Sequence, residues 1–335
     1  MGRYSACRKR QRWQRVGYAV CIYLNLVSCN TYVAGSRMHD TNIEVLEAGS
    51  KCLPAPELAA PRGAIIKVAT EPELQAAVSK LQDNTTILLS PGDYVLTNTL
   101  NIRKKNVTLR GSEHSCDAVR LIGRGMNNSN YGNVPHGIYS NSVGTKIQNL
   151  SIRDVYHHAI TLNHGSNAPH IYNVKLLDSG EQFIKANPGP NFGEGTDNGV
   201  VEFTIMEYLD KTPNHSGSVG YTNGVDVHGG TDWIIRKNLF KNFHTPDNAD
   251  FLWNPAVLIW RGSEGTLTEG NVFIDVTRAI AYGLEDDENG KSHVGGIIRN
   301  NMIVYSDGLF SHSRKAASDG AILVWDSPKT KVYHN

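Results

Sequence analysis

Apolar and polar positions alternate in short runs over most of the chain. Each run begins with a small residue and an apolar residue and then alternates, as in Ala159-Ile160-Thr161-Leu162. A period of two over three or four residues is typical of short β-strands with one buried face. The apolar residues that anchor the seven runs are Ile138, Ile160, Ile184, Val225, Val257, Ile280 and Ile322.

A second motif, an asparagine flanked by apolar residues, recurs between these runs. Its asparagines are Asn149, Asn173, Asn238, Asn271, Asn301 and Asn335, and Glu202 is assigned to the same position in one repeat. Two short strands per repeat, joined by loops of uneven length, indicate a parallel β-solenoid. Stacked coils then share one core, and each asparagine can hydrogen-bond its equivalent in the next coil.

One helix is expected before the repeats. Thr70 and Glu73 form a capping box, and the apolar residues that follow have helical spacing, which predicts a helix over 71–82. We expect it to cover the first coil, where bare strand edges would otherwise promote aggregation.

The repeats, the preceding helix and the Pro-Gly-Asp-Tyr-Val-Leu turn at 91–96 together resemble proteins of the pectate-lyase-like superfamily. The resemblance covers roughly 65–335 and implies an all-β fold, a single-stranded right-handed parallel β-helix with an N-terminal capping helix. Function is implied only loosely, since this fold carries lyases, hydrolases, epimerases and non-catalytic surface proteins. Lyases of the superfamily often use a Lys or Arg base, an Arg on the uronate and sometimes Ca²⁺.

Composition argues against a nucleic-acid partner. The 335 residues include 33 Lys and Arg against 32 Asp and Glu, a formal net charge of +1, whereas a nucleic-acid-binding surface needs a basic excess. Apolar residues make up 40% of the chain, enough for a core. No run of 18 apolar residues is present, so no membrane-spanning helix is expected.

The first residues read as an export signal. A basic segment precedes the apolar run 16–26, and Leu26-Val27-Ser28-Cys29 resembles a bacterial lipobox, which implies lipidation of Cys29. We expect an outer-membrane lipoprotein that faces the periplasm or the cell surface and is attached to the membrane by its lipid. The alternatives are an ordinary cleaved signal and an uncleaved anchor.

Three segments follow from this interpretation. They are a signal peptide at 1–29, a proline-containing tether at 30–62 and the β-helix domain at 63–335, which we expect to be truncated because the repeat is still running at the last residue. In an exported chain, Cys52 and Cys116 either form one disulfide or remain as two buried thiols.

The outward-facing positions follow from the alternation. With the anchors pointing inward, the next residue of each strand points outward, and so does the residue two further on. Adjacent coils are about 4.8 Å apart, so outward residues of neighbouring coils form one surface. The predicted central patch contains Lys185, Asp226, His228, Trp260 and Arg261, flanked by Asn163, His164 and Asn187 on one side and by Trp325 and Asp326 on the other.

These side chains suit an acidic polysaccharide. Trp260 and Trp325 can stack on sugar faces, and Arg261 can bind a carboxylate through two hydrogen bonds. Lys185 or His228 can remove the proton from the carbon next to that carboxylate, which begins a β-elimination. We therefore assign catalysis to Lys185, His228 and Arg261. Substrate contacts are assigned to Asn163, His164, Asn187, Trp260, Trp325 and Asp326.

A structural interpretation stands beside each assignment. Lys185 and Asp226 could form a surface ion pair, and His228 could hydrogen-bond the turn that follows it. The tryptophans could pack as partly buried side chains, and His157-His158 could pack or face solvent. Because Lys185 is expected to point outward, its replacement by Ala is expected to leave folding intact.

The acidic run Glu285-Asp286-Asp287-Glu288 follows the strand at 279–283. Together with Asp226, the carboxylates of Glu285, Asp286 and Asp287 could bind Ca²⁺, although such a run is more often a solvated loop. The Asp-Asp pair also resembles that of polygalacturonases, whose other motifs are absent. Asp226 with Asp286 or Asp287 is the only pair of carboxylates suited to a hydrolase.

The sequence thus predicts an exported, monomeric enzyme whose partner is an acidic polysaccharide, with a lyase that cleaves a uronate-containing polymer as the leading hypothesis. The alternatives are a non-catalytic carbohydrate-binding or surface protein, with the insertion 187–223 as its recognition loop, and a glycoside hydrolase.

Overall fold

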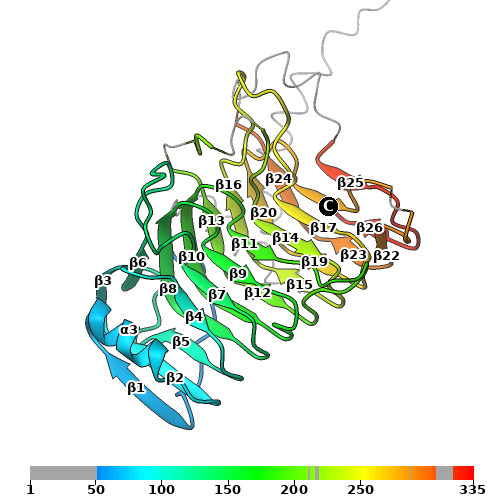
Figure 1. Cartoon of the computed structure of the whole chain (residues 1–335). Helices are drawn as coiled ribbons and strands as arrows, with labels where there is room; N and C mark the ends of the chain where they lie inside the picture. Colours follow the sequence, from blue (N-terminus) through cyan, green and yellow to red (C-terminus); the bar gives the residue numbers. More distant parts are fainter. Residues whose placement is uncertain (1–50, 210–211, 216–218, 287, 307–319) are drawn as a thin grey trace, which may run out of the picture. The chain divides into compact units, whose positions relative to one another are not determined.

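The structure is a computed structural model that describes residues 51–335, apart from 210–211, 216–218, 287 and 307–319. Every strand pairing within this part is parallel, and the strands stack into a coil (Figure 1). The prediction of an all-β parallel β-helix is confirmed. The predicted signal peptide and Cys29 lie outside the described residues. Among the helices that the structure describes, none has the length and apolarity needed to cross a membrane.

The largest sheet, called here the long sheet, has sixteen strands. Its main path is β1 (Ala64–Val68), β2 (Thr85–Leu89), β5 (Thr108–Gly111), β8 (Lys146–Val155), β10 (His170–Ser179), β12 (Val200–Glu202), β15 (Ile234–Arg236), β19 (Leu267–Glu269), β23 (Ile297–Arg299) and β26 (Lys331–Tyr333). Its remaining strands are β3 (Gly92–Val95), β6 (Val119–Ile122), β13 (Ile205–Glu207), β16 (Leu239–Lys241), β20 (Val272–Ile274) and β24 (Met302–Val304).

A second sheet of eight strands forms another face of the coil. Its strands, in order, are β4 (Leu100–Ile102), β7 (Ile138–Ser140), β9 (Ile160–Leu162), β11 (Ile184–Ala186), β14 (Val225–His228), β17 (Val257–Trp260), β21 (Ile280–Tyr282) and β25 (Ile322–Val324). The short strands β18 (Ser263–Glu264) and β22 (His293–Val294) pair separately.

The core forms as the alternation predicts. The anchors pair with one another from coil to coil, and Ile138, Ile160, Ile184, Val225, Val257 and Ile280 are fully buried. Burial of each such side chain contributes about 1.5–3 kcal/mol. Phe240 and Phe273 stack between neighbouring coils with ring centroids 4.7 Å apart. The hydrophobic interior therefore holds the coils in register.

The predicted asparagine ladder is present, in two sections. The side-chain amide of Asn173 donates to Asn149 at 2.9 Å, and a longer section joins Asn238, Asn271, Asn301 and Asn335 through bonds of 2.8–3.0 Å. The assignment of Glu202 to this ladder is wrong. Glu202 pairs with Tyr172, the residue before Asn173, and so does not lie opposite the ladder asparagine. The ladder is therefore interrupted at this coil.

The helix α3 (Glu71–Ser79) begins at the predicted capping box, in which Thr70 and Glu73 bond each other's backbone amides. It ends before the predicted residue 82, with Lys80 as its C-cap. Its buried residues Leu74 and Ala77 join the core, and the helix contacts β1 to β4.

Cys52 and Cys116 form a disulfide with a Cα–Cα distance of 5.6 Å, so the disulfide alternative is confirmed. Arg110 donates to the carbonyl oxygen of Ala59 at 2.6 Å. The hydroxyl of Tyr172 donates to the carbonyl oxygen of Pro56 at 2.5 Å. The segment 52–59, assigned to the tether, is therefore packed on the coil, and the ordered domain starts before the predicted residue 63.

The asparagine ladder gives a first prediction. Asn271 is fully buried, and its side-chain oxygen accepts both from the backbone and from the side chain of Asn238. The change Asn271→Ala should lower the free energy of unfolding by about 3 kcal/mol, because buried donors lose their acceptor. Denaturant unfolding measures this. The exposed Asn141→Ala should change stability by less than about 0.5 kcal/mol, and equal effects of the two changes would contradict a role for the ladder.

Candidate functional site

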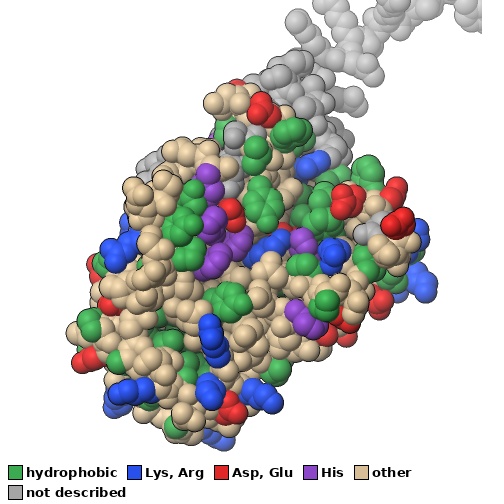
Figure 2. Space-filling view, in the orientation of Figure 1, with side chains coloured by type: hydrophobic (Ala, Val, Ile, Leu, Met, Phe, Trp, Pro, Cys, Tyr) green, Lys and Arg blue, Asp and Glu red, His purple; other side chains and the backbone are tan. Residues whose placement is uncertain are grey.

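The register of the eight-stranded sheet brings four predicted residues together. Lys185 on β11 lies opposite Asp226 on β14, and His228 on β14 lies opposite Trp260 on β17. Histidine, lysine and arginine side chains gather on the face shown in Figure 2. The sequence therefore predicts both the pairing of these residues and the face on which they lie.

Lys185, Asp226 and His228 form a hydrogen-bonded group, called here the triad. Lys185 Nζ lies 2.5 Å from Asp226 Oδ2 and 2.7 Å from His228 Nε2, and His228 Nε2 lies 3.2 Å from the Asp226 carboxylate. The indole N–H of Trp260 donates to Asp226 Oδ1 at 3.0 Å. Both oxygens of the carboxylate are thus engaged.

The Asp226 carboxylate is stabilised in its ionised form by its neighbours. Burial by itself would raise the pKa of Asp226, but the positive charges of Lys185 and His228 and their hydrogen bonds outweigh burial. The pKa of Asp226 is therefore well below its usual range. Asp226 stays ionised and can act as an electrostatic partner, but it does not supply a proton.

His228 can adopt two tautomers in this setting. Both of its contacts use Nε2, which either accepts from Lys185 or donates to Asp226. When Nε2 donates to Asp226, the Nδ1 lone pair can accept a proton from a substrate. When Nε2 accepts from Lys185, Nδ1 carries the proton. The arrangement can therefore take up a proton at His228 and release it again.

The expectation that Lys185 could be removed without a cost to folding assumed an exposed side chain, and the structure shows a buried one. Its side chain is 4% exposed and that of Asp226 is 2% exposed, so the pair is buried and is no surface ion pair. Tyr221, from the chain between β13 and β14, lies with its ring centroid 5.9 Å from Lys185 Nζ. The Lys185 ammonium is enclosed by Asp226 and His228 of the neighbouring strand, and Tyr221 lies nearby.

The predicted flanking asparagines form a row of their own at the ends of β9 and β11. Asn187 donates to Asn163 at 2.8 Å, and Asn163 donates to the hydroxyl of Tyr139 at 2.5 Å. His164 is exposed, and its Nδ1 lies 3.2 Å from the carbonyl oxygen of Gly195. These residues are part-buried or exposed polar groups that a sugar hydroxyl can contact.

Three other predicted residues are not in contact with the triad. Trp325 is 54% exposed and lies in the row of Trp260, beyond Gly283. Asp326 accepts from Lys291 at 2.7 Å and from the backbone of Ser292 at 3.0 Å, which anchors a loop. Arg261 follows Trp260 with a positive φ of 58°. Its Nη1 is buried and has no hydrogen-bond partner among the described residues.

The predicted calcium ligands do not assemble in the described part of the chain. Asp226 is buried in the triad, whereas Glu285 and Asp286 are exposed on a loop, and Asp287 lies outside the described residues. Asp226, Glu285 and Asp286 do not form a group with ligand atoms close together. The pairing of Asp226 with Asp286 or Asp287 as the two carboxylates of a hydrolase is also disfavoured. Both oxygens of the Asp226 carboxylate already accept hydrogen bonds within the site.

The sequence missed a second group, called here the histidine cluster, which contains His136, His157, His158, Glu181 and His215. His157 Nδ1 lies 2.8 Å from Glu181 Oε1, and His158 Nε2 lies 3.3 Å from Glu181 Oε2. The rings of His136 and His158 stack with centroids 5.2 Å apart. Four of these residues lie two or three positions before a strand anchor: His136 before Ile138, His157 and His158 before Ile160, and Glu181 before Ile184. Comparing the positions that precede each anchor in the sequence would have shown this regularity.

Burial keeps most of this cluster neutral. It lowers the pKa of His136 to about 4, with a smaller contribution from His157. The pKa of His158 is lowered well below its usual value, first by burial, then by His136 and by the charge of Lys185. Because Lys185 acts on His158, the histidine cluster and the triad lie close enough for their charges to interact.

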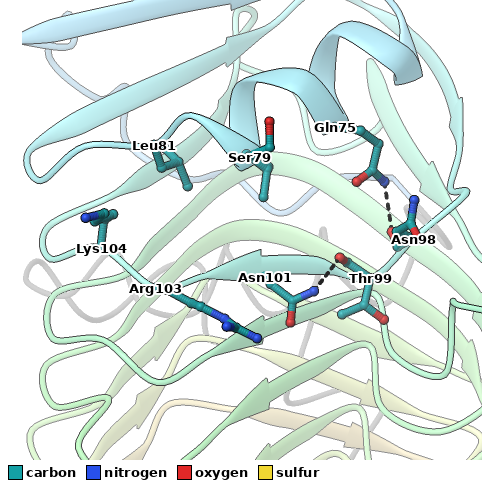
Figure 3. Close-up of a pocket in the computed structure, with 9 residues that line it drawn as sticks. Gln75, Ser79, Leu81, Asn98, Thr99, Asn101, Arg103 and Lys104 are labelled. Atoms are coloured by element: carbon teal, nitrogen blue, oxygen red, sulfur yellow. Dashed lines mark hydrogen bonds between the residues drawn. The ribbon is translucent and has the colours of Figure 1, made fainter.

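A cavity of about 480 Å³ lies at the start of the eight-stranded sheet, between α3 and β4. Figure 3 shows Arg103 and Lys104 on one side and Gln75 and Asn98 on the other. Asn101, which also lines it, pairs with Tyr139 in the outward row that leads to Lys185. The cavity thus adjoins the same face as the triad.

No protein-family model matches the chain. Among curated proteins, 84 residues are 33% identical to xylosyltransferase oxt of Drosophila melanogaster. That match covers 23% of this chain and 10% of the xylosyltransferase, so the chain spans about a tenth of that protein's length.

Several solved lyases are similar over most of the chain. An alginate lyase from Paenibacillus sp. has 11% identity and a TM-score of 0.46, with 81% of this chain and 98% of that chain covered. The PL6 family alginate lyase AlyGC has 11% identity and a TM-score of 0.44, with 84% and 41% covered. A pectate lyase from Bacillus sp. N165, in complex with trigalacturonate, has 11% identity and a TM-score of 0.43, with 79% and 94% covered. At these values, substrate and reaction have to be inferred from the residues of this chain.

The buried pair gives a second prediction. The change Lys185→Met should lower the free energy of unfolding by about 3 kcal/mol at pH 7, because Asp226 keeps a buried charge without its cation. The folded-state pKa of Asp226 is depressed, so its stabilising contribution is present above its unfolded value of about 4 and is lost as the pH falls below it. The stability difference between wild type and variant should therefore shrink in acid, as denaturant unfolding at several pH values would show. A difference that grows in acid would contradict the ion pair.

Proposed function

We propose that this protein is a polysaccharide-acting enzyme, and specifically a lyase that cleaves a uronate-containing polymer by β-elimination. The observation that carries the proposal is the triad, because it places a histidine that can exchange protons beside a buried ion pair on one face of the coil. Support comes also from the polar row of Asn163 and Asn187 and from the exposed Trp325, which suit sugar hydroxyls and sugar faces.

In the proposed reaction, His228 Nδ1 removes the proton from the carbon next to the uronate carboxylate. The electron pair of that C–H bond forms a carbon–carbon double bond, the glycosidic C–O bond breaks, and the leaving oxygen takes a proton. Asp226 accepts from Nε2 and stabilises the imidazolium, and Lys185 holds Asp226 in place. Arg261 has an unpaired Nη1 with which it can bind the carboxylate once its side chain reorients.

The proposal includes export and a lipid at Cys29. The basic N-terminal segment and the lipobox-like sequence support it, and so does the disulfide, because such bonds persist in oxidising compartments.

Catalysis is tested with alginate and polygalacturonate. Cleavage by elimination should produce new ultraviolet absorbance, and His228→Gln should lower kcat by at least about 100-fold because it removes the proton-transfer group. Lys241→Met is a matched control: it removes a lysine that pairs with buried Glu207 at 2.9 Å on the long sheet, and it should retain activity. New reducing ends without absorbance would indicate a hydrolase, and binding without turnover would indicate a non-catalytic protein.

The cavity between α3 and β4 gives a prediction about how KM depends on the length of the substrate. It lies three strand spacings from β11, or about 14 Å, so only a longer chain can reach both Lys185 and Arg103. The double change Arg103→Gln with Lys104→Gln should raise KM several-fold for long oligosaccharides and leave KM for short ones unchanged. The exposed Lys146→Gln on the long sheet is the control, and a uniform effect at all lengths would contradict a distal subsite.

A further inference from the structure

The histidine cluster contains a set of donors that fits a metal ion. One ligand atom from each of His157, Glu181 and His215 can be chosen so that all three lie within 4.8 Å of one another. The shortest separation, between His157 Nδ1 and Glu181 Oε1, is 2.8 Å. Ligands that share one ion at bond lengths of about 2.1 Å lie about 3–3.5 Å apart. Small side-chain rotations would therefore bring all three donors onto one ion.

The charge of Glu181 calls for a cation at this position. Its carboxylate is 15% exposed, and the side chains within ion-pair distance among the described residues are the imidazoles of His157 and His158. No Lys or Arg side chain of the described residues lies within ion-pair distance of Glu181, so a bound cation would compensate the carboxylate for the water that it has lost.

His215 supplies an independent observation. Both of its ring nitrogens are buried, and the backbone carbonyl of Tyr156 is the hydrogen-bonding group that acts on the ring, at a geometry too poor for a regular hydrogen bond. The ring is nonetheless firmly placed, since it stacks on Tyr156 with centroids 4.0 Å apart. The ring also lies close to Gly180: a Cβ atom added to that glycine would be 2.3 Å from His215 Cε1. A neutral imidazole that directs its N–H toward a backbone carbonyl keeps the lone pair of its other nitrogen available for coordination.

We propose that His157, Glu181 and His215 bind a divalent transition-metal ion, with Zn²⁺ as the best match. Imidazole nitrogens suit zinc and its neighbours in the first transition row, whereas Ca²⁺ prefers six or more oxygen ligands. His158 is the positioning residue, because its Nε2 lies beside Glu181 Oε2 and its Nδ1 lies 3.2 Å from the carbonyl oxygen of Gln182. This site differs from the calcium site that the acidic run suggested.

Three protein ligands leave a coordination position open. Glu181 precedes the strand β11 by three residues, and Lys185 lies on that strand. A uronate carboxylate held at the open position would lie near the triad, and this last step rests on the proposed lyase function. Binding of the ion itself does not depend on that function.

The test uses the purified full chain, stripped with a chelator and studied without substrate. Isothermal titration with Zn²⁺ should show one site per chain, and Co²⁺ should give visible absorption bands of an ion bound through nitrogen and oxygen. The changes His215→Ala and Glu181→Gln should each weaken Zn²⁺ binding by at least about 10-fold. His114→Ala, an exposed histidine bonded to the backbone of Ala55, should bind Zn²⁺ as the wild type does.

Thermal unfolding provides a second readout that guards against misfolded variants. Saturating Zn²⁺ should raise the Tm of the wild type and of His114→Ala and leave the Tm of His215→Ala unchanged, since an ion stabilises only a protein that binds it. Absence of stoichiometric Zn²⁺ binding by the wild type, or equal affinity in His215→Ala, would overturn the proposal. Preference for Ca²⁺ over Zn²⁺ would overturn it as well. A protein that binds Zn²⁺ and cleaves no uronate polymer would retain the metal site and lose only the lyase assignment.

Discussion

In-register parallel pairing is the constraint on which the rest of the molecule depends. A parallel ladder repeats each position at a fixed spacing of about 4.8 Å, so residues tens of positions apart in sequence must lie side by side. Lys185 and Asp226 are 41 residues apart and still face each other across one strand pair. Buried apolar anchors on one side and the asparagine ladder at the corner both hold this register. A slip by one residue would turn each triad side chain into the core.

The strands and the triad were predictable from the sequence because both follow from periodicity. Once Ile184 and Val225 are taken as inward-facing, Lys185 and Asp226 must be outward-facing neighbours, and the structure agrees. The corners were less predictable. Glu202 falls one position from the ladder because the number of residues at a turn is not fixed by the repeat.

Burial at the site could not be predicted, because it depends on segments that have no period. Tyr221 and His215 both come from the chain between β13 and β14, and nothing in the repeat indicates where that chain lies. The alternation correctly placed Lys185 on the outer face, but it gave no information on what covers that face. The Lys185–Asp226 pair is buried, and the energetic consequences of its removal are those of a buried ion pair.

The two ends of the site have different origins in the chain. The triad belongs entirely to the strands β11 and β14, whereas the proposed metal ligands combine two coil corners with His215 from a loop. A loop at a coil corner can be exchanged without altering the strand register. During divergence, a chain that acquired another loop in this place would keep the triad while it lost or replaced one of the proposed metal ligands. Ion dependence is therefore the property that we expect to vary most readily among proteins that share this coil.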